Sequence, residues 1–310
     1  MDAEHIGKRP LDGVRVVDLT EAAPGQMCTG LLGDMGADVI RVQRTRGPID
    51  DAARSRSILR NKRSLGLDLG SVQGKEILSR LVASADVLVE GMRPGALGRL
   101  GFGYDDVAER NPRIVYCSMS GYGQTGPYSE YPGYDLNFVG VAGYLDLFPN
   151  PAVPPFGLAD FAAVPMHATI GILLALMARE RIGVGQHVDI SFADTTLGLL
   201  AATSPYRDYV DHGVRIEHMG GLFSGEYPFY GTYEAADGRW LSVTGSEHRF
   251  WQNLCRALGV EHLIEAGAAQ PGFNARRPTV DAARVRQDLQ QVFRRKTRDE
   301  WLAELPRHDV

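Results

Sequence analysis

The stretch VRVVDLTEAAPGQMCTGLLGDMGADVIRV, residues 14–42, decides the fold because it reads as a strand, a helix and a second strand in succession. Val14–Leu19 is a short β-branched run typical of a buried strand, and Asp38–Val42 has a similar composition. Between them, Pro24–Met35 has helical spacing, and Gly36 suits the position that follows a helix end. One face of this expected helix carries Met27, Leu31, Leu32 and Met35. The unit predicts two parallel strands joined by a helix.

The same alternation of strands and helices continues outward from this unit to about residue 209. The expected elements are a helix after Ser71, strands at Asp86–Glu90 and Arg113–Met119, a helix at roughly Ala163–Arg179, a strand at His187–Phe192 and a helix at about Asp194–Tyr209. Units at this spacing indicate a parallel sheet covered by helices.

The character of the chain changes after residue 209. Residues 210–227 are rich in Gly, His and polar side chains, which predicts a linker. Two aromatic and β-branched runs then flank Asp237-Gly238, a strong signal for a β-hairpin, and helical segments follow it. We therefore expect a large domain at 1–209, a linker at 210–227 and a small α+β domain at 228–310.

The composition is that of an ordinary soluble protein, with 44% of 310 residues hydrophobic and 23% charged. A formal net charge of −5 argues against a general nucleic-acid binder. The first residues, MDAEHIGKRP, lack the apolar core of a signal peptide, and the apolar stretch Ala168–Ala178 is too short to span a membrane. Cys28, Cys117 and Cys255 lie far apart, which fits a reducing compartment. We expect a cytoplasmic protein without nucleic-acid or membrane partners.

One segment is densely basic. Only Asp50 and Asp51 oppose its eight cationic residues, which are Arg41, Arg44, Arg46, Arg54, Arg56, Arg60, Lys62 and Arg63. Such a segment in an acidic protein predicts either a site for a small polyanion or a solvated, arginine-rich loop. The eight histidines have no metal-ligand spacing, so no metal site is expected.

Gly121, Gly123 and Gly126 form a G-x-G-x-x-G pattern after an expected strand. In a dinucleotide-binding site this pattern opens a helix whose N-terminus faces the pyrophosphate. Pro127 and Pro132 interrupt the residues that follow, and proline lacks the N–H that a helix interior needs. The context therefore does not favour dinucleotide binding.

Asp160 is the carboxylate that stands out, because it follows a Pro/Gly turn and precedes an apolar helix. The positive end of the helix dipole favours its ionised form there, and open α/β folds bind ligands at such an edge. The alternative is a carboxylate that only caps the helix. Asp135 and Glu247 are further candidates for a functional carboxylate, and the alternative for each is an ordinary surface or loop carboxylate.

Five blocks of the sequence resemble, in order, those of class III CoA-transferases, the CaiB/BaiF group that includes formyl-CoA transferases and α-methylacyl-CoA racemases. The blocks are PLDGVRVVDLT, LLGDMGADVIRVQR, NKRSLGLDL, DVLVEGMRPGALGRLGFGYDDVAERNPRIVYCSMSGYGQTGPY and YEAADGRWLSVTGSEHRFW. The resemblance runs from Pro10 to the chain end and implies that the glycine pattern is a loop shaping an acyl-CoA site.

The resemblance implies a large Rossmann-like domain and a smaller α+β domain, with two chains interlocked as a homodimer. In the family a C-terminal segment returns to the large domain. The chain here stops mid-pattern at RHDV, so we expect that return segment to be missing.

The resemblance also implies roles for single residues. Asp160 matches the aspartate that, in the transferases, attacks an acyl-CoA thioester and carries CoA to a carboxylic acid through an anhydride and an aspartyl-CoA thioester. Coenzyme A and acyl-CoA are then substrates, and no tightly bound cofactor is expected. Asp135 matches a residue beside the thioester, and Glu247 is placed to orient Asp160 or to face the acyl group. Matches to cofactor contacts are Arg44, Leu67, Asp68, Arg99 and Tyr134.

The family divides at Tyr134. Racemases have a histidine there, and it works with an aspartate to move the α-proton of the thioester. Tyrosine, with a pKa near ~10, does not easily replace a histidine as a base at neutral pH, so Tyr134 favours transfer. The alternatives are a racemase and a non-catalytic acyl-CoA binder, and the intact Asp160 argues against the second of these.

Overall fold

The computed structural model describes residues 9–45, 57–148, 152–201, 203–213, 225, 227–265 and 282–310. The chain divides into two compact units, a larger one of Met1–Leu145 with Ala152–Leu200 and a smaller one of Asp146–Pro151 with Ala201–Val310. Each unit has its own hydrophobic core. Most of the expected linker, residues 210–227, lies outside the described residues.

The larger unit is built on a six-stranded parallel sheet with the order β3-β2-β1-β4-β5-β6. This is the strand order of Rossmann-like folds, and it confirms the expected α/β class. The chain changes direction across the sheet between β1 and β4, which opens a crevice at their carboxyl ends. The strands are β1 (Arg15–Asp18), β2 (Asp38–Gln43), β3 (Lys62–Gly66), β4 (Val87–Glu90), β5 (Val115–Ser120) and β6 (His187–Ser191).

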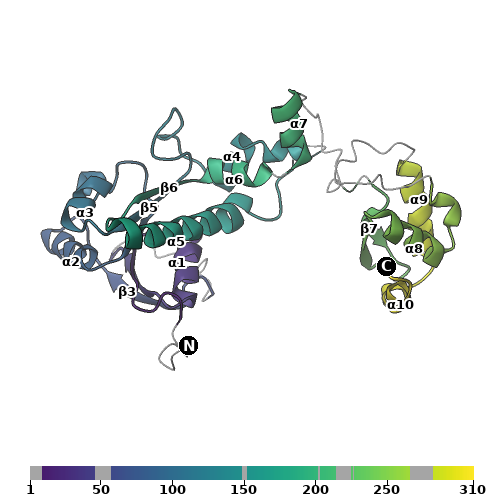
Figure 1. Ribbon diagram of the computed structural model, residues 1–310, viewed down its shortest axis with the longest axis horizontal. Helices are drawn as coiled ribbons and strands as arrows, with labels where there is room; N and C mark the ends of the chain where they lie inside the picture. The colour runs from purple at the N-terminus through teal and green to yellow at the C-terminus, as the bar shows by residue number, and fades with distance from the viewer. Residues whose placement is uncertain are drawn as a thin grey trace. The chain divides into compact units, whose positions relative to one another are not determined.

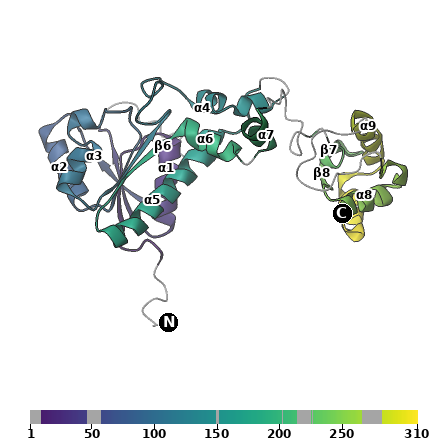
Figure 2. The same cartoon turned by 45° about the horizontal axis from the view of Figure 1, so that its top comes forward.

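Helices cover both faces of the sheet, as Figures 1 and 2 show. On one face, Val16 belongs to a core shared with α1 (Ala23–Asp34) and α5 (Val164–Ile182). On the other, Val17 belongs to a core shared with α2 (Val72–Ala83) and α3 (Tyr104–Arg110). Successive strand residues point to opposite faces, so one short run of valines serves both layers.

The expected apolar face of α1 is only partly correct. Leu32 is buried, but Met35 is 48% exposed, and Cys28 and several glycines are buried instead. Small residues let α1 approach its neighbours closely. A Cβ at Gly33, for example, would lie 3.0 Å from the Asn61 Cβ.

Two further expectations about elements need correction. The single helix expected at about 194–209 is two helices, α6 (Phe192–Leu200) and α7 (Ser204–His212). Pro205 stands at the start of α7, where its missing N–H costs no helical hydrogen bond. Strand β3 was not expected, because its sequence KRSLG is charged and half-exposed, as suits an edge strand.

The α5 helix with the turn before it, Ala159–Ile182, is long and apolar enough to cross a membrane by length and composition alone. It is therefore longer than the apolar stretch identified from the sequence. In the fold it packs on β5, β6 and α1 as one of the helices that cover the sheet.

The smaller unit has the expected hairpin. Strand β7 (Tyr230–Glu234) pairs antiparallel with β8 (Trp240–Thr244), and Gly238 in the turn has φ +72°. Among the described residues, the hairpin is followed by the helices α8 (His248–Leu258), α9 (Ala282–Phe293) and α10 (Arg298–Glu304), and α7 also belongs to this unit. Its core contains the fully buried side chains of Tyr233, Trp251 and Phe293, which confirms a small α+β unit.

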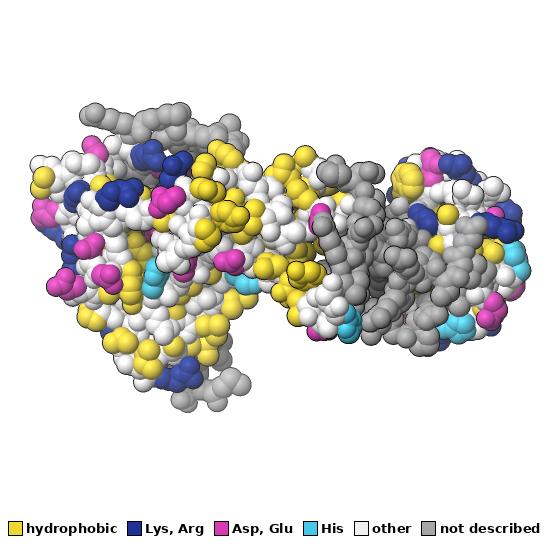
Figure 3. All heavy atoms as spheres, turned by 90° about the horizontal axis from the view of Figure 1, so that it is seen from above, with side chains coloured by type: hydrophobic (Ala, Val, Ile, Leu, Met, Phe, Trp, Pro, Cys, Tyr) yellow, Lys and Arg dark blue, Asp and Glu magenta, His cyan; other side chains and the backbone are white. Residues whose placement is uncertain are grey.

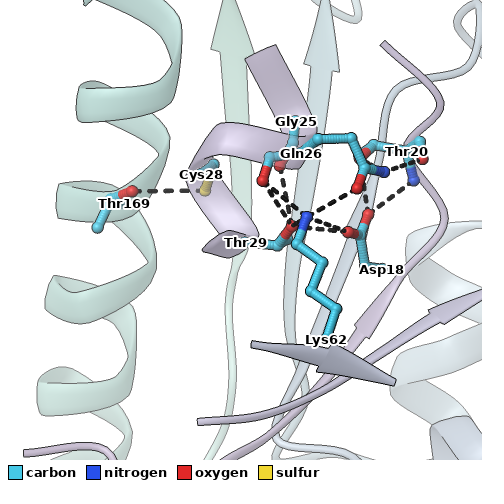
Figure 4. Close-up of polar contacts among 8 residues, drawn as sticks. All are labelled: Asp18, Thr20, Gly25, Gln26, Cys28, Thr29, Lys62 and Thr169. Atoms are coloured by element: carbon cyan, nitrogen blue, oxygen red, sulfur yellow. Dashed lines mark hydrogen bonds and ion pairs between the residues drawn. The ribbon is translucent and has the colours of Figure 1, made fainter. Parts of the chain in front are cut away.

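A buried ion pair and its hydrogen bonds join β1, α1 and β3 of the larger unit (Figure 4). The Lys62 Nζ lies 3.2 Å from Asp18 Oδ2, and the two side chains are 2% and 0% exposed. The same ammonium donates to Gln26 and to the Thr29 hydroxyl, each at 2.7 Å. Asp18 in turn accepts from the hydroxyls of Thr20 and Thr29, each at 2.6 Å. Burial lowers the pKa of Lys62, while the Asp18 charge opposes that shift.

Replacing Lys62 with methionine should therefore lower the free energy of unfolding of the larger unit by about 3–5 kcal/mol, because it leaves the Asp18 charge buried without its cation. Urea unfolding should be followed by circular dichroism, since Trp240, Trp251 and Trp301 all lie in the smaller unit. Lys75→Met is the matched control. A loss below about 1 kcal/mol would show that the pair is not needed.

Candidate functional site

Two of the candidate carboxylates lie together. Asp160 sits in a π-helical turn, Ala159–Ala163, which continues directly into α5. Asp135 is the first residue of α4 (Asp135–Val141), and its Oδ1 accepts the Asp160 backbone N–H at 3.0 Å. π-Helical turns are rare and are found frequently at functional sites. Asp160 thus lies inside the helix, in its first turn, rather than ahead of it.

The electrostatics of Asp160 differ from the expectation based on the helix dipole. Burial, as the larger cause, and the nearby charge of Asp135 together raise the pKa of Asp160 to about 6. Desolvation and a like charge therefore outweigh the favourable end of the helix. At neutral pH and above the carboxylate is still mostly ionised, so it can act as a nucleophile or as a base.

The glycine loop between β5 and α4 positions Asp135 from the other side. A Cβ at Gly121 or at Gly133 would lie 2.5 Å from the Phe138 ring of α4, so neither position has room for a side chain. Gly123 and Gly126 adopt φ values of +85° and +99°, which favour glycine. No helix starts within this loop, and its glycines are explained by packing against α4 at Gly121 and Gly133 and by left-handed backbone at Gly123 and Gly126.

A pocket of about 350 Å³ opens at the carboxyl ends of β1 to β4, where a fold of this strand order binds ligands. Most of its wall is aliphatic. The lining residues are Leu19, Glu21, Val42, Gln43, Arg44, Thr45, Leu67, Asp68, Leu69, Gly70, Met92 and Leu100. The buried Glu90 carboxylate accepts the Met92 N–H at 2.8 Å and so holds the turn that brings Met92 to the wall.

The pocket brings together three residues expected from the sequence: Arg44, Leu67 and Asp68. Arg44 follows β2, the position at which a Rossmann-like site contacts a ribose and at which arginine accommodates a ribose phosphate. Its Nε lies 2.6 Å from Glu21 Oε1. Sequence reasoning missed Glu21, Leu19 and Met92, although each follows a strand that borders the switch point.

The remaining candidates lie as follows. Arg99 is exposed and precedes the pocket residue Leu100 in the short turn Gly98–Leu100. Tyr134, directly before Asp135, is 84% exposed, and its N–H is bound by Asn137 Oδ1 at 3.0 Å. Glu247 is an exposed residue of the smaller unit, immediately before α8.

The basic segment is less open to anions than its local sequence suggests. Arg46, Arg54 and Arg56 lie outside the described residues. Arg60 pairs with Asp34, and Arg63 pairs with Asp38. Lys62 and Arg44 are also paired, as described above, so acids from β1, β2 and α1 balance charges that looked unopposed in the sequence. Within the described ranges no group of three or more His, Cys, Asp and Glu side chains could hold a metal ion.

Comparison with known proteins finds a matching family and relatives along nearly the whole chain. A family model described as CoA-transferase family III matches residues 11–310. An alpha-methylacyl-CoA racemase from Mus musculus is 35% identical, with 94% of this chain and 74% of that protein covered. An acyl-CoA transferase from Fusarium pseudograminearum is 33% identical, with 94% and 68% covered. The crystal structure of a CAIB/BAIF family protein from Brucella suis matches with a TM-score of 0.77 at 32% identity, covering 98% of this chain and 83% of that one.

The Asp135–Asp160 contact predicts a titration. The Asp160 carboxyl should titrate near pH 6, and Asp135→Asn should lower its pKa, because removing a negative neighbour favours the ionised form. Carbon-13 NMR of labelled aspartates would measure both, with Asp146→Asn as the control that leaves the Asp160 pKa unchanged. An Asp160 pKa near ~4 in the unmodified protein would contradict the burial of this group.

Proposed function

The chain belongs to CoA-transferase family III, and from that premise we propose that it moves coenzyme A from an acyl-CoA thioester to a free carboxylic acid. The observation that carries the proposal is Asp160, a carboxylate held in a π-helical turn by Asp135 and partly removed from water. The family contains transferases and racemases alike, so the choice of transfer rests on the residues around Asp160.

The proposed reaction proceeds in two halves. An Asp160 oxygen attacks the donor thioester carbonyl, the C–S bond breaks, and a mixed anhydride forms as CoA thiolate leaves. The thiolate then attacks the aspartyl carbonyl and expels the donor acid, which takes one Asp160 oxygen with it. The resulting aspartyl-CoA thioester reacts with the acceptor carboxylate by the same steps in reverse, giving the new acyl-CoA and a free Asp160.

The pocket supports CoA as the substrate. Arg44 offers a guanidinium to a ribose phosphate at the mouth of the pocket, and the aliphatic wall suits a flat base. We assign Leu67 and Asp68 to the same contact surface, with Arg99 as a second cation near its edge. No tightly bound cofactor forms part of the proposal.

Tyr134 favours transfer over racemisation. A racemase needs two groups that exchange a proton across the α-carbon, and the neighbour of Asp135 here is a phenol whose ordinary pKa lies near ~10. Asp135 holds the Asp160 amide and acts as a positioning residue in this proposal. One observation favours the racemase as second candidate: a carboxyl pKa of about 6 also suits a general base.

A homodimer remains part of the proposal. The apolar side chains of Met166, Ile170, Leu174 and Met177 form an exposed stripe along α5, the kind of surface that a second copy would cover. From the family resemblance we also propose a role for Glu247 of the smaller unit in orienting Asp160 or facing the acyl group. The same resemblance is the basis for proposing a cytoplasmic location.

We expect a covalent adduct on Asp160 when the protein is mixed with a suitable acyl-CoA. Hydroxylamine should convert the activated carboxyl to a hydroxamate, which mass spectrometry would find on the Asp160 peptide, and Asp160→Asn should abolish it. Asp146→Asn is the control that keeps the adduct.

Two results would count against transfer. The first is turnover of acyl-CoA with an Asp160 that is never modified. The second is rapid deuterium uptake at the α-carbon in heavy water without exchange of acids, which would establish the racemase.

Replacing Arg44 with alanine should weaken CoA binding by about 1–3 kcal/mol, the range for a charge-assisted hydrogen bond. Calorimetry with CoA and with dephospho-CoA would locate the contact, because the loss should vanish when the ribose phosphate is absent. Arg80→Ala, an exposed arginine of α2 that pairs with Glu76, is the matched control. Unchanged CoA affinity in Arg44→Ala would remove Arg44 from the site.

A further inference from the structure

The part of the chain that surrounds Asp160 is unusually poor in cations. From Ile114 to Ala178 the sequence contains no lysine and no arginine. This segment supplies the glycine loop, α4, the π-helical turn and most of α5. Its charged residues are the acids Glu130, Asp135, Asp146 and Asp160, and its sole histidine is His167.

The elements packed against the π-helical turn do not make up for this lack. In the part of the chain that the structure describes, the helices that pack most closely on this turn are α1, α4, α5 and α6, of which α1, α4 and α6 contain no lysine or arginine. Figure 2 shows α6 beside the start of α5. The arginines of α5, Arg179 and Arg181, stand at its opposite end, and Arg179 lies roughly 28 Å along the helix axis from Asp160. Arg179 is engaged there by Asp86 at 3.0 Å.

Aromatic side chains occupy the place beside the carboxylates instead. Phe156 and Phe161 pack with ring centroids 5.8 Å apart, and they remain 55% and 37% exposed. Gly157 joins this pair to the acids, since a Cβ there would lie 3.0 Å from the Phe161 ring and 3.2 Å from Asp135 Oδ1. Figure 3 shows exposed hydrophobic side chains at several places on one face of the larger unit, with Lys and Arg side chains beside some of them.

These surroundings discriminate between acyl groups. A second carboxylate on the substrate would meet the negative charges of Asp135 and Asp160 with no cation from these elements to balance it. An alkyl or aryl acyl group would instead cover exposed phenylalanine surface, which favours binding by about fourfold for each buried methylene. The absence of any cation among the causes of the raised Asp160 pKa agrees with this picture.

We propose that the acyl group accepted at Asp160 is apolar and carries no second carboxylate, and that Phe156 and Phe161 form the surface that receives it. The inference rests on the proposed function, because it concerns the acyl group that reaches the Asp160 oxygen. It adds a substrate class that family membership leaves open.

Matched donors test the inference. Hexanoyl-CoA and adipyl-CoA have equal chain lengths and differ by one terminal carboxylate, as do butyryl-CoA and succinyl-CoA. Rapid-quench measurement of adduct formation on Asp160 needs no acceptor acid. We expect each apolar donor to react on the order of 100-fold faster than its dicarboxylic partner. Equal rates, or faster reaction of the dicarboxylic donors, would overturn the inference.

A binding measurement separates this inference from the proposed function. Hexyl and 5-carboxypentyl thioethers of CoA cannot transfer an acyl group, so calorimetry reports on recognition alone. If no donor labels Asp160 but the hexyl thioether binds at least about tenfold more tightly, transfer is wrong and the acyl class stands. If the two thioethers bind equally, the acyl class is wrong whatever the chemistry.

Phe156→Lys tests the assigned surface, because it places a cation beside the acidic pair. It should shift the hexanoyl-to-adipyl rate ratio by at least about tenfold towards adipyl-CoA. Val72→Lys, at an exposed position of α2, is the matched control and should leave the ratio unchanged. If Phe156→Lys alters the sedimentation of the protein but not the ratio, the phenylalanines belong to a contact between copies, and their assignment is overturned.

Discussion

The ammonium of Lys62 and the carboxylate of Asp18 are buried together at the end of β1, where one strand from the middle of the sheet, its edge strand and a covering helix meet. Two buried charges are tolerated only when their remaining hydrogen-bonding atoms are satisfied, and here α1 supplies Gln26 and Thr29 for that purpose. The network therefore fixes β1, β3 and α1 relative to one another. Leu19 and Leu67, which lie just beyond its two strands, are walls of the pocket.

The two halves of the proposed site follow opposite electrostatic rules. At the pocket, the proposed phosphate contact is a cation, Arg44, which forms an ion pair with Glu21 in this structure. At the π-helical turn, an acid is placed beside another acid, and no lysine or arginine of the neighbouring elements offsets them. A molecule with a phosphorylated head and an electrophilic, uncharged tail suits both, and a fatty or aromatic acyl thioester of CoA has that form.

The sequence predicted the parallel sheet, the hairpin and the α+β character of the smaller unit, because hydrophobic period and turn residues are local signals. It did not predict β3, whose charged residues face solvent or, for Lys62, a partner on another strand. The sequence also did not show that charges of the basic segment are neutralised, because Asp34 and Asp38 pair with Arg60 and Arg63 only in the folded chain. At the site, the resemblance pointed to Asp135 and Asp160, but their contact and its effect on the pKa depend on burial. The domain boundaries, a functional role for Glu247 and the formation of a homodimer stay predictions.

The account depends most on the passage of acyl oxygen through Asp160, and an isotope can follow it directly. If the acceptor acid carries oxygen-18 in its carboxylate, the anhydride route leaves one labelled oxygen on Asp160 after each turnover in ordinary water. Mass spectrometry of the Asp160 peptide after several turnovers should then show the added mass of the heavy oxygen. Turnover that leaves this peptide without label would contradict the mechanism.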